Sequence, residues 1–193
     1  MSVIRERDGV VTVVSGLPRS GTSMMMRMLE KGGMAALVDD HRPADEDNPN
    51  GYYELKAVFD TAKDASWLEA AEGKCVKMVY ALLPDLPFDF DYKVLFLRRP
   101  LEEVVASQDV MLRRRGAPES REGATDFASD LRRVEAWLKE EPYITTLDVE
   151  YHEVLREPLV VAKRVADFLG GGLDIHAMAG AVDPALYRQR RRT

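Results

Sequence analysis

Residues 10 to 29 contain the feature that most constrains how this chain folds. A run of β-branched apolar residues at positions 10–14 leads to Gly16, and a short loop then reaches Gly21. After the loop, apolar residues recur at helical spacing, at Met24, Met25, Met28 and Leu29. The sequence therefore predicts a strand, a loop of the size that holds one phosphate or sulfate group, and a helix.

The loop between the two glycines is suited to binding an anion. Its backbone N–H groups and the positive end of the following helix dipole point into such a loop, and glycine lets an anion approach the backbone. The stretch fits the nucleotide-binding pattern G-x-x-x-x-G-K-[ST] except that Thr22 stands where the pattern has lysine. The loop thus lacks the main charged contact to ATP or GTP phosphates, and Arg19 supplies a cation instead.

This segment resembles the 5′-phosphosulfate loop of sulfotransferases that use 3′-phosphoadenosine 5′-phosphosulfate (PAPS). Two further stretches, residues 48–54 (Asn-Pro-Asn-Gly-Tyr-Tyr-Glu) and residues 151–170, are similar to segments of the same family. The resemblance implies that Arg19 and Thr22 offset charge that develops during sulfuryl transfer. It implies that the sulfate end of PAPS binds to the loop residues Pro18, Arg19, Ser20, Gly21, Thr22 and Ser23.

A second strand–turn–helix unit begins at the continuous apolar run 92–97 and resembles the family's 3′-phosphate-binding element. In that element an arginine ends the strand, a proline follows two residues later, and a serine lies eight residues after the arginine. Arg98 has the proline spacing, whereas Arg99 has the serine spacing to Ser107. One of the two arginines, with Ser107, is therefore expected to bind the 3′-phosphate, and we favour Arg98. A basic strand end paired with Glu102 or Glu103 is the alternative.

Two residues compete for the role of general base, which would accept the proton of the acceptor. Glu54 is one; its alternative role is a first-turn glutamate stabilised by the dipole of a helix that runs through Val58, Phe59, Trp67 and Leu68. His41, in the polar loop 38–50, is the other, and it titrates near neutral pH. The alternative for His41 is an exposed loop residue without a chemical role.

Lys77 interrupts the apolar pattern of a second predicted strand, residues 74–80. Some sulfotransferases carry a lysine at a comparable strand end, near the bridging oxygen of the leaving group, so the resemblance makes Lys77 a stabiliser of that group. The alternative is a strand-edge lysine in solvent, which we rate somewhat higher from sequence alone.

The remaining patterns complete a βα alternation. Residues 126–141 form an amphipathic helical stripe, residues 143–149 alternate as a strand, and a last helix is predicted between Pro158 and Gly170. Such alternation predicts a parallel sheet. Together with the resemblance it implies an α/β fold, a P-loop-like three-layer sandwich whose central, mostly parallel sheet is flanked by helices. The length predicts a single domain over residues 1–193.

Composition excludes several classes of function. The formal net charge of −6 argues against a nucleic-acid or acidic-membrane surface, and no apolar run reaches membrane-spanning length. Cys75 is the only cysteine, so neither an intrachain disulfide nor a cysteine metal cluster is expected. These features favour a cytoplasmic protein.

The sequence thus predicts a sulfotransferase that moves a sulfuryl group from PAPS to a hydroxyl or amine by in-line transfer, releasing 3′-phosphoadenosine 5′-phosphate (PAP), without a metal. It leaves the acceptor open, whether a small molecule, a glycan or a peptide, and likewise the oligomeric state. A P-loop small-molecule kinase that uses ATP is one alternative. A catalytically inactive protein that binds PAP or another nucleotide is the other.

Overall fold

The computed structural model of the 193-residue chain describes residues 9–39, 45, 48, 51–114, 116, 124–183 and 185. These residues contain four strands: β1 (Val10–Gly16), β2 (Cys75–Lys77), β3 (Asp91–Arg98) and β4 (Ile144–Glu150). The α-helices are α1 (Thr22–Lys31), α2 (Leu101–Arg114), α3 (Ala124–Glu140), α4 (Tyr151–Arg156), α5 (Pro158–Leu169) and α6 (Ile175–Gly180). Three short 3₁₀ helices are η1 (Lys56–Asp60), η2 (Ser66–Ala71) and η3 (Tyr80–Asp85).

The four strands form one parallel sheet in the order β2-β1-β3-β4. In its register, Val14 of β1 lies beside Lys77 of β2, and Gly16 lies beside Leu97 of β3. The expected α/β fold with a central parallel sheet is therefore confirmed.

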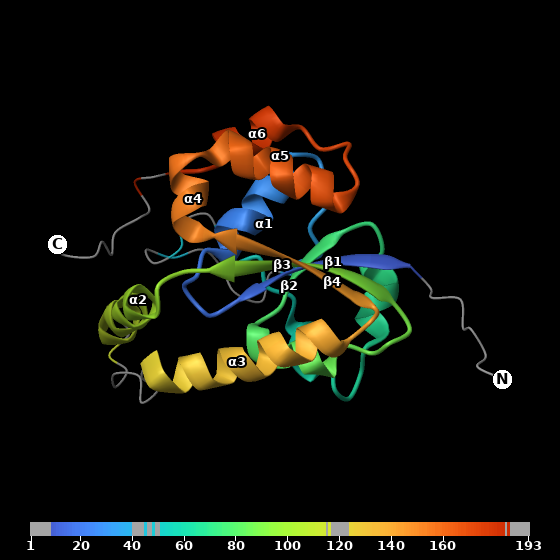
Figure 1. Cartoon of the computed structure of the whole chain (residues 1–193), viewed down its shortest axis with the longest axis horizontal. Helices are drawn as coiled ribbons and strands as arrows, with labels where there is room; N and C mark the ends of the chain where they lie inside the picture. The colour runs from blue at the N-terminus through green and yellow to red at the C-terminus, as the bar shows by residue number, and fades with distance from the viewer. Residues whose placement is uncertain are drawn as a thin grey trace.

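Helices cover both faces of the sheet, as Figure 1 shows, with α1, α4, α5 and α6 on one face and α3 on the other. The central strand β3 explains why both layers form, because its successive side chains point to opposite faces. Val94 and Phe96 belong to the hydrophobic core that includes α3, whereas Leu95 and Leu97 belong to the core that includes α1 and α5. A strand buried on both faces requires the continuous apolar run seen in the sequence.

The strand order creates a crevice at one edge of the sheet. The chain leaves β1 toward β2 on one side and leaves β3 toward β4 on the other, so the direction of the connections reverses between β1 and β3. Open α/β sheets bind ligands outside the carboxyl ends of their strands at such a point. In Figure 1 this edge lies to the left, where α2 is placed beyond the end of β3.

The segment after Glu54 departs from the sequence-based prediction. Instead of one helix through Leu68 it forms η1 and η2, separated by a turn in which Asp64 Oδ1 accepts the N–H of Ser66 at 3.0 Å. An aspartate side chain that bonds to the backbone two residues on favours a turn over a helix. The strand predicted at 74–80 is also shorter, because η3 begins at Tyr80.

The other predicted elements are confirmed. Helices α2 and α3 cover the predicted periodic stretches, and α5 begins at Pro158 and ends at Leu169, just before Gly170, whose φ of 106° is left-handed. Among the described residues, none of the helices combines the length and apolarity needed to cross a bilayer. His41 and the basic stretch at 188–192 lie outside the described residues.

Gly21, at the end of the β1–α1 loop, and Gly33, just after α1, separate two costs of an added side chain: backbone strain and steric clash. Both have φ of 102°, but a Cβ at Gly21 would lie 2.6 Å from the Tyr151 ring, whereas a Cβ at Gly33 would meet nothing within 4 Å. We expect Gly33→Ala to lower the free energy of unfolding by about 1–2 kcal/mol, the usual cost of a left-handed alanine. Gly21→Ala should cost more, because a clash adds to the same strain. Urea unfolding of both variants measures the difference, and equal losses would show that Tyr151 does not constrain the loop.

Candidate functional site

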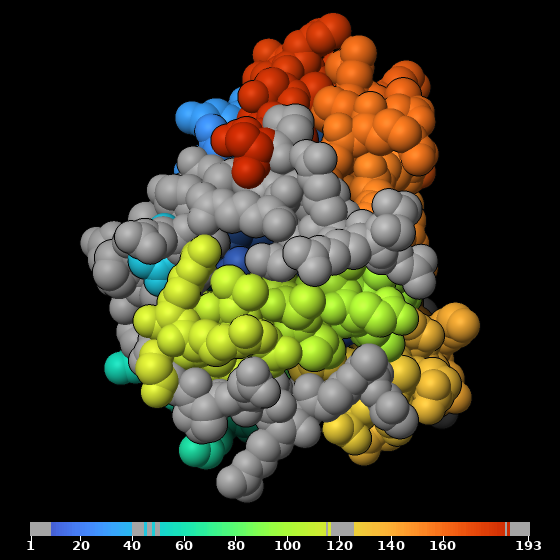
Figure 2. Space-filling model, turned by 90° about the vertical axis from the view of Figure 1, so that its left-hand side faces the viewer, coloured from blue at the N-terminus to red at the C-terminus, as the bar shows by residue number. Residues whose placement is uncertain are grey.

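A pocket of about 410 Å³ opens at the carboxyl edge of the sheet, between the β1–α1 loop, α2 and the segments around Tyr52 and Lys77. Figure 2 views the molecule from this edge: α2 lies across the face, and blue atoms of the β1–α1 region are visible in a hollow beside it. The predicted anion loop, the predicted 3′-phosphate element and the predicted acid–base residue thus come together in one cavity.

Most residues of the predicted anion loop line the pocket. Gly16, Pro18, Arg19, Gly21, Thr22 and Ser23 are lining residues. Helix α1 has no side-chain cap at its N-terminus, so its first N–H groups, which lack intrahelical acceptors, are available to a ligand. Ser20 differs from the expectation: it is 1% exposed, does not line the pocket, and its backbone N–H is bonded to Leu17 O at 3.1 Å.

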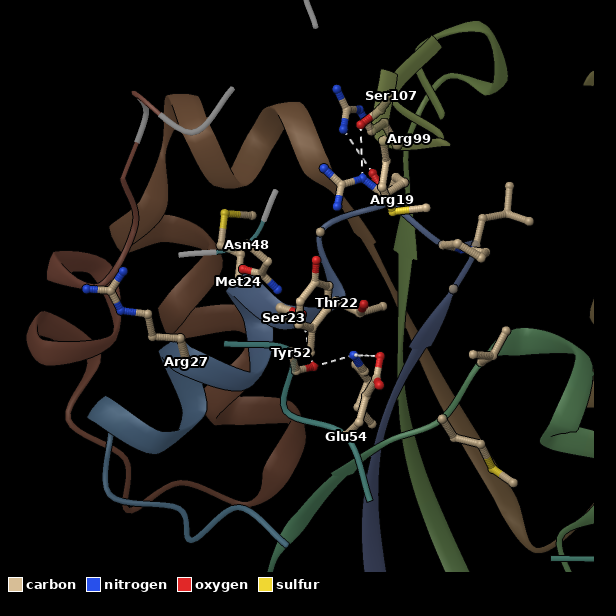
Figure 3. Close-up of a pocket in the computed structure, with 18 of the residues that line it drawn as sticks. Arg19, Thr22, Ser23, Met24, Arg27, Asn48, Tyr52, Glu54, Arg99 and Ser107 are labelled. Carbon is tan, nitrogen blue, oxygen red and sulfur yellow. Dashed lines mark hydrogen bonds and ion pairs between the residues drawn. The ribbon is translucent and has the colours of Figure 1, made fainter. Parts of the chain in front are cut away.

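Arg19 takes a left-handed backbone conformation, φ 68°, that is uncommon for a residue with a side chain. Two contacts from the second unit hold it there. Its Nε donates to Ser107 Oγ at 3.0 Å, and its carbonyl oxygen accepts from Arg99 Nη1 at 2.9 Å (Figure 3). Strained residues held by surrounding contacts occur preferentially at functional sites.

Arg99, and not Arg98, occupies the pocket, so our preference for Arg98 is revised. Arg99 lines the cavity with Ser107, and its guanidinium lies 4.5 Å from the centre of the Tyr151 ring. Arg98 turns to the other face of the sheet, where it stacks on Phe96 at 4.3 Å and forms ion pairs with Glu135 and, at 2.8 Å, Asp148. The reason is strand alternation, since residues 96 and 98 share a face of β3.

A buried carboxylate fixes Arg99. Glu103, 4% exposed, accepts from Arg99 Nε at 3.0 Å and lies 3.0 Å from His152 Nε2. From sequence, pairing of the arginine with Glu103 was the alternative to phosphate binding. The pair is present, and it holds Arg99 in the pocket wall rather than away from it. Sequence reasoning missed His152 and Tyr151 as neighbours of this arginine, although both lie in the C-terminal segment that carries the family resemblance.

Glu54 and Lys77 form an ion pair on the pocket wall. Lys77 Nζ lies 3.3 Å from Glu54 Oε1, and the two side chains are 10% and 16% exposed, respectively. Both residues line the cavity. The alternative of a lysine in solvent is therefore wrong, and so is the alternative of a first-turn glutamate, because Glu54 precedes η1 and is not part of a helix.

The Tyr52 backbone connects this ion pair to the anion loop. Its carbonyl oxygen accepts from Ser23 Oγ at 3.2 Å and also from Lys77 Nζ. Figure 3 shows this chain of contacts running from α1 to Glu54. The Glu54–Lys77 ion pair is thus held in a fixed place relative to the loop.

Burial shifts the pKa of a thiol and of a phenol outside the Glu54–Lys77 pair. Burial raises the pKa of the Cys75 thiol to about 12, so the thiol stays protonated and is a poor nucleophile at neutral pH. Burial also raises the pKa of Tyr151, whose hydroxyl stays neutral beside Arg99. Within the described ranges, no cluster of three or more His, Cys, Asp or Glu side chains could hold a metal ion.

Comparison with known proteins identifies the fold. No protein-family model and no curated protein sequence matches the chain. Among solved structures, the sulfotransferase domain from the Synechococcus PCC 7002 olefin synthase matches with a TM-score of 0.59 and 17% identity, over 97% of this chain and 82% of that one. The sulfotransferase domain from the curacin biosynthetic pathway matches with a TM-score of 0.54 and 17% identity, over 97% and 80%. The chain therefore has the fold of sulfotransferase domains, as the sequence resemblance implied.

Glu103 is expected to be essential for stability. Glu103→Ala leaves Arg99 in a buried position without its carboxylate, and the loss of one partner of a buried ion pair costs about 3–5 kcal/mol. Chemical denaturation should reveal this loss. Its neighbour Glu102 is exposed on the same turn of α2, so Glu102→Ala should change stability by less than about 0.5 kcal/mol. Similar effects of the two substitutions would contradict a structural role for the Glu103–Arg99 pair.

Proposed function

We propose that this protein is a sulfotransferase that uses PAPS as its donor. The observation that carries the proposal is the union, in one pocket, of a phosphate-type loop without the triphosphate lysine, an Arg99–Ser107 pair and a Glu54–Lys77 pair. The fold shared with sulfotransferase domains supports this proposal.

The residues present fit the two anionic ends of PAPS. The loop residues Pro18 to Ser23, except the buried Ser20, would hold the 5′-phosphosulfate with backbone N–H groups and the Arg19 guanidinium. Arg99 would form the forked hydrogen bonds that phosphate oxygens accept, and the Ser107 hydroxyl would add another to the 3′-phosphate. Among the described residues, five basic and two acidic side chains line the pocket, and their charge favours such a polyanion: Arg19, Arg27, Lys77, Arg99 and Arg114, against Glu54 and Asp183.

The Glu54–Lys77 pair supplies the acid–base chemistry. PAPS, when bound, provides an activated sulfuryl group. Glu54 would accept the proton of the acceptor's hydroxyl or amine, which makes that group a better nucleophile. The Lys77 ammonium orients the Glu54 carboxylate and adds positive charge beside it. Arg19 and Thr22 would face the transferred sulfuryl group from the loop. His41 remains a second candidate for the base, and it lies outside the described residues.

The kinase alternative is less well supported. A P-loop kinase uses the loop lysine to hold the terminal phosphates of ATP, and Thr22 stands at that position here. The alternative of an inactive nucleotide-binding protein leaves the Glu54–Lys77 pair in the pocket wall without a role.

Binding of PAP tests the proposed donor and the choice between the two arginines. With PAP at about a hundred times its Kd, thermal unfolding should show about 2.7 kcal/mol of stabilisation. Arg98→Ala should retain the stabilisation, because Arg98 lies outside the pocket, and Arg99→Ala should lose most of it. Ser107→Ala should weaken the effect as well, while it leaves the Arg99–Glu103 pair intact.

Two outcomes of that experiment would contradict the proposal. One is stabilisation by ATP with magnesium but not by PAP, which would favour a kinase. The other is loss of PAP stabilisation in Arg98→Ala together with its retention in Arg99→Ala.

Glu54→Gln tests the general base. The substitution keeps the shape of the side chain but removes its ability to accept a proton, so kcat should fall by about 10²–10⁴-fold. PAP binding should remain, because Glu54 is assigned to the acceptor and not to the donor. A kcat within threefold of the unmodified protein would exclude Glu54 as the base and leave His41 for the same test.

A further inference from the structure

The surroundings of the Glu54–Lys77 pair differ in character from the rest of the pocket. The lining residues that follow Glu54 are Leu55, Val58 and Phe59, and those that follow Lys77 are Met78, Val79 and Leu82. All six are apolar. The other charged lining residues come from the β1–α1 loop, α1, the end of β3, α2 and, in Asp183, the segment after α6.

The topology of the sheet separates these two regions. The proposed donor contacts lie at the ends of β1 and β3, which are neighbours in the sheet. Lys77 and the apolar residues after it continue from β2, which lies on the opposite side of β1. A donor held by the loop and by Arg99 therefore leaves the β2 side of the pocket to the acceptor.

Phe59 is the exposed residue of the apolar wall, whereas Leu55, Val79 and Leu82 are half-buried. Val58 and Met78 are 2% and 1% exposed, whereas Phe59 is 51% exposed although it lines the pocket. A large aromatic ring that stays half-exposed in the free protein gains from contact with an apolar ligand, because such contact removes apolar surface from water. A polyhydroxylated acceptor would find few hydrogen-bonding partners among these six side chains, and its hydroxyl groups would lose their water.

We infer that the acceptor is an alcohol with an apolar body, an alkyl or aryl group that lies against the wall formed by Leu55, Val58, Phe59, Met78, Val79 and Leu82. This inference rests on the proposed function, since it assigns Glu54 to the acceptor hydroxyl. In the reaction the acceptor oxygen forms a bond to the sulfur of PAPS, the sulfur–oxygen bond to the 5′-phosphate breaks, PAP leaves with that electron pair, and Glu54 takes the hydroxyl proton. The products are a sulfate ester and PAP.

The test compares two six-carbon primary alcohols, 1-hexanol and 1,2,6-hexanetriol, as acceptors with PAPS. The kcat/KM for 1-hexanol should exceed that for the triol by roughly tenfold to a hundredfold. Phe59→Ala should raise the KM for 1-hexanol roughly tenfold. Phe88→Ala is the matched control, because Phe88 is 60% exposed but does not line the pocket, and it should leave KM unchanged. Saturation-transfer NMR of 1-hexanol with the protein alone gives a second readout that needs no turnover.

The outcomes separate this inference from the proposed function. Equal or better use of the triol, or equal effects of the two phenylalanine substitutions, would overturn the apolar acceptor while sulfuryl transfer stands. If neither alcohol is sulfated and PAP does not bind, the proposed function fails and the NMR signal decides the inference alone. A signal that Phe59→Ala abolishes and Phe88→Ala retains would support an apolar ligand at this wall, and a signal unchanged in Phe59→Ala would overturn it.

Discussion

The hydrogen bond from Arg99 to the carbonyl oxygen of Arg19 joins the two strand–loop–helix units on which the pocket depends. It is charge-assisted, and such bonds are stronger than neutral ones. Glu103 holds Arg99 in place by accepting from its Nε. The Nε of Arg19 in turn donates to Ser107 Oγ on α2. Because Arg19, Arg99 and Ser107 line the cavity, the contacts that stabilise the loop also place two cations where the proposed nucleotide, with an anionic group at each end, would bind.

This arrangement resolves an apparent conflict between the charge of the chain and that of its pocket. The protein carries a formal net charge of −6, yet basic residues outnumber acidic ones among the described residues of the pocket wall. These wall residues therefore contribute none of the acidic excess. Anionic ligands are attracted by the local charge of a cleft, where low-dielectric walls focus the field, more than by the net charge of the chain.

The sequence predicted the strands, the loop and the fold class because each depends on local pattern. The apolar run 92–97 requires burial on both faces of the sheet. The glycines of the loop are needed where an anion or a neighbouring side chain approaches the backbone closely. It did not decide between Arg98 and Arg99, because motif spacing supports both and only the alternation along β3 separates their side chains. The 3₁₀ helices after Glu54 were missed as well, since apolar spacing alone does not reveal the turn at Asp64. The Lys77–Glu54 pair joins residues 23 positions apart and needed the folded chain to be seen.

The central claim is that the pocket holds a nucleotide by both of its anionic ends. Isothermal titration with PAP and with adenosine 5′-phosphate tests it most directly, because the two ligands differ only in the 3′-phosphate that we assign to Arg99 and Ser107. The account predicts that PAP binds about a hundredfold more tightly, a difference of about 2.7 kcal/mol. Equal affinities would show that no 3′-phosphate site exists in this pocket and would contradict the account.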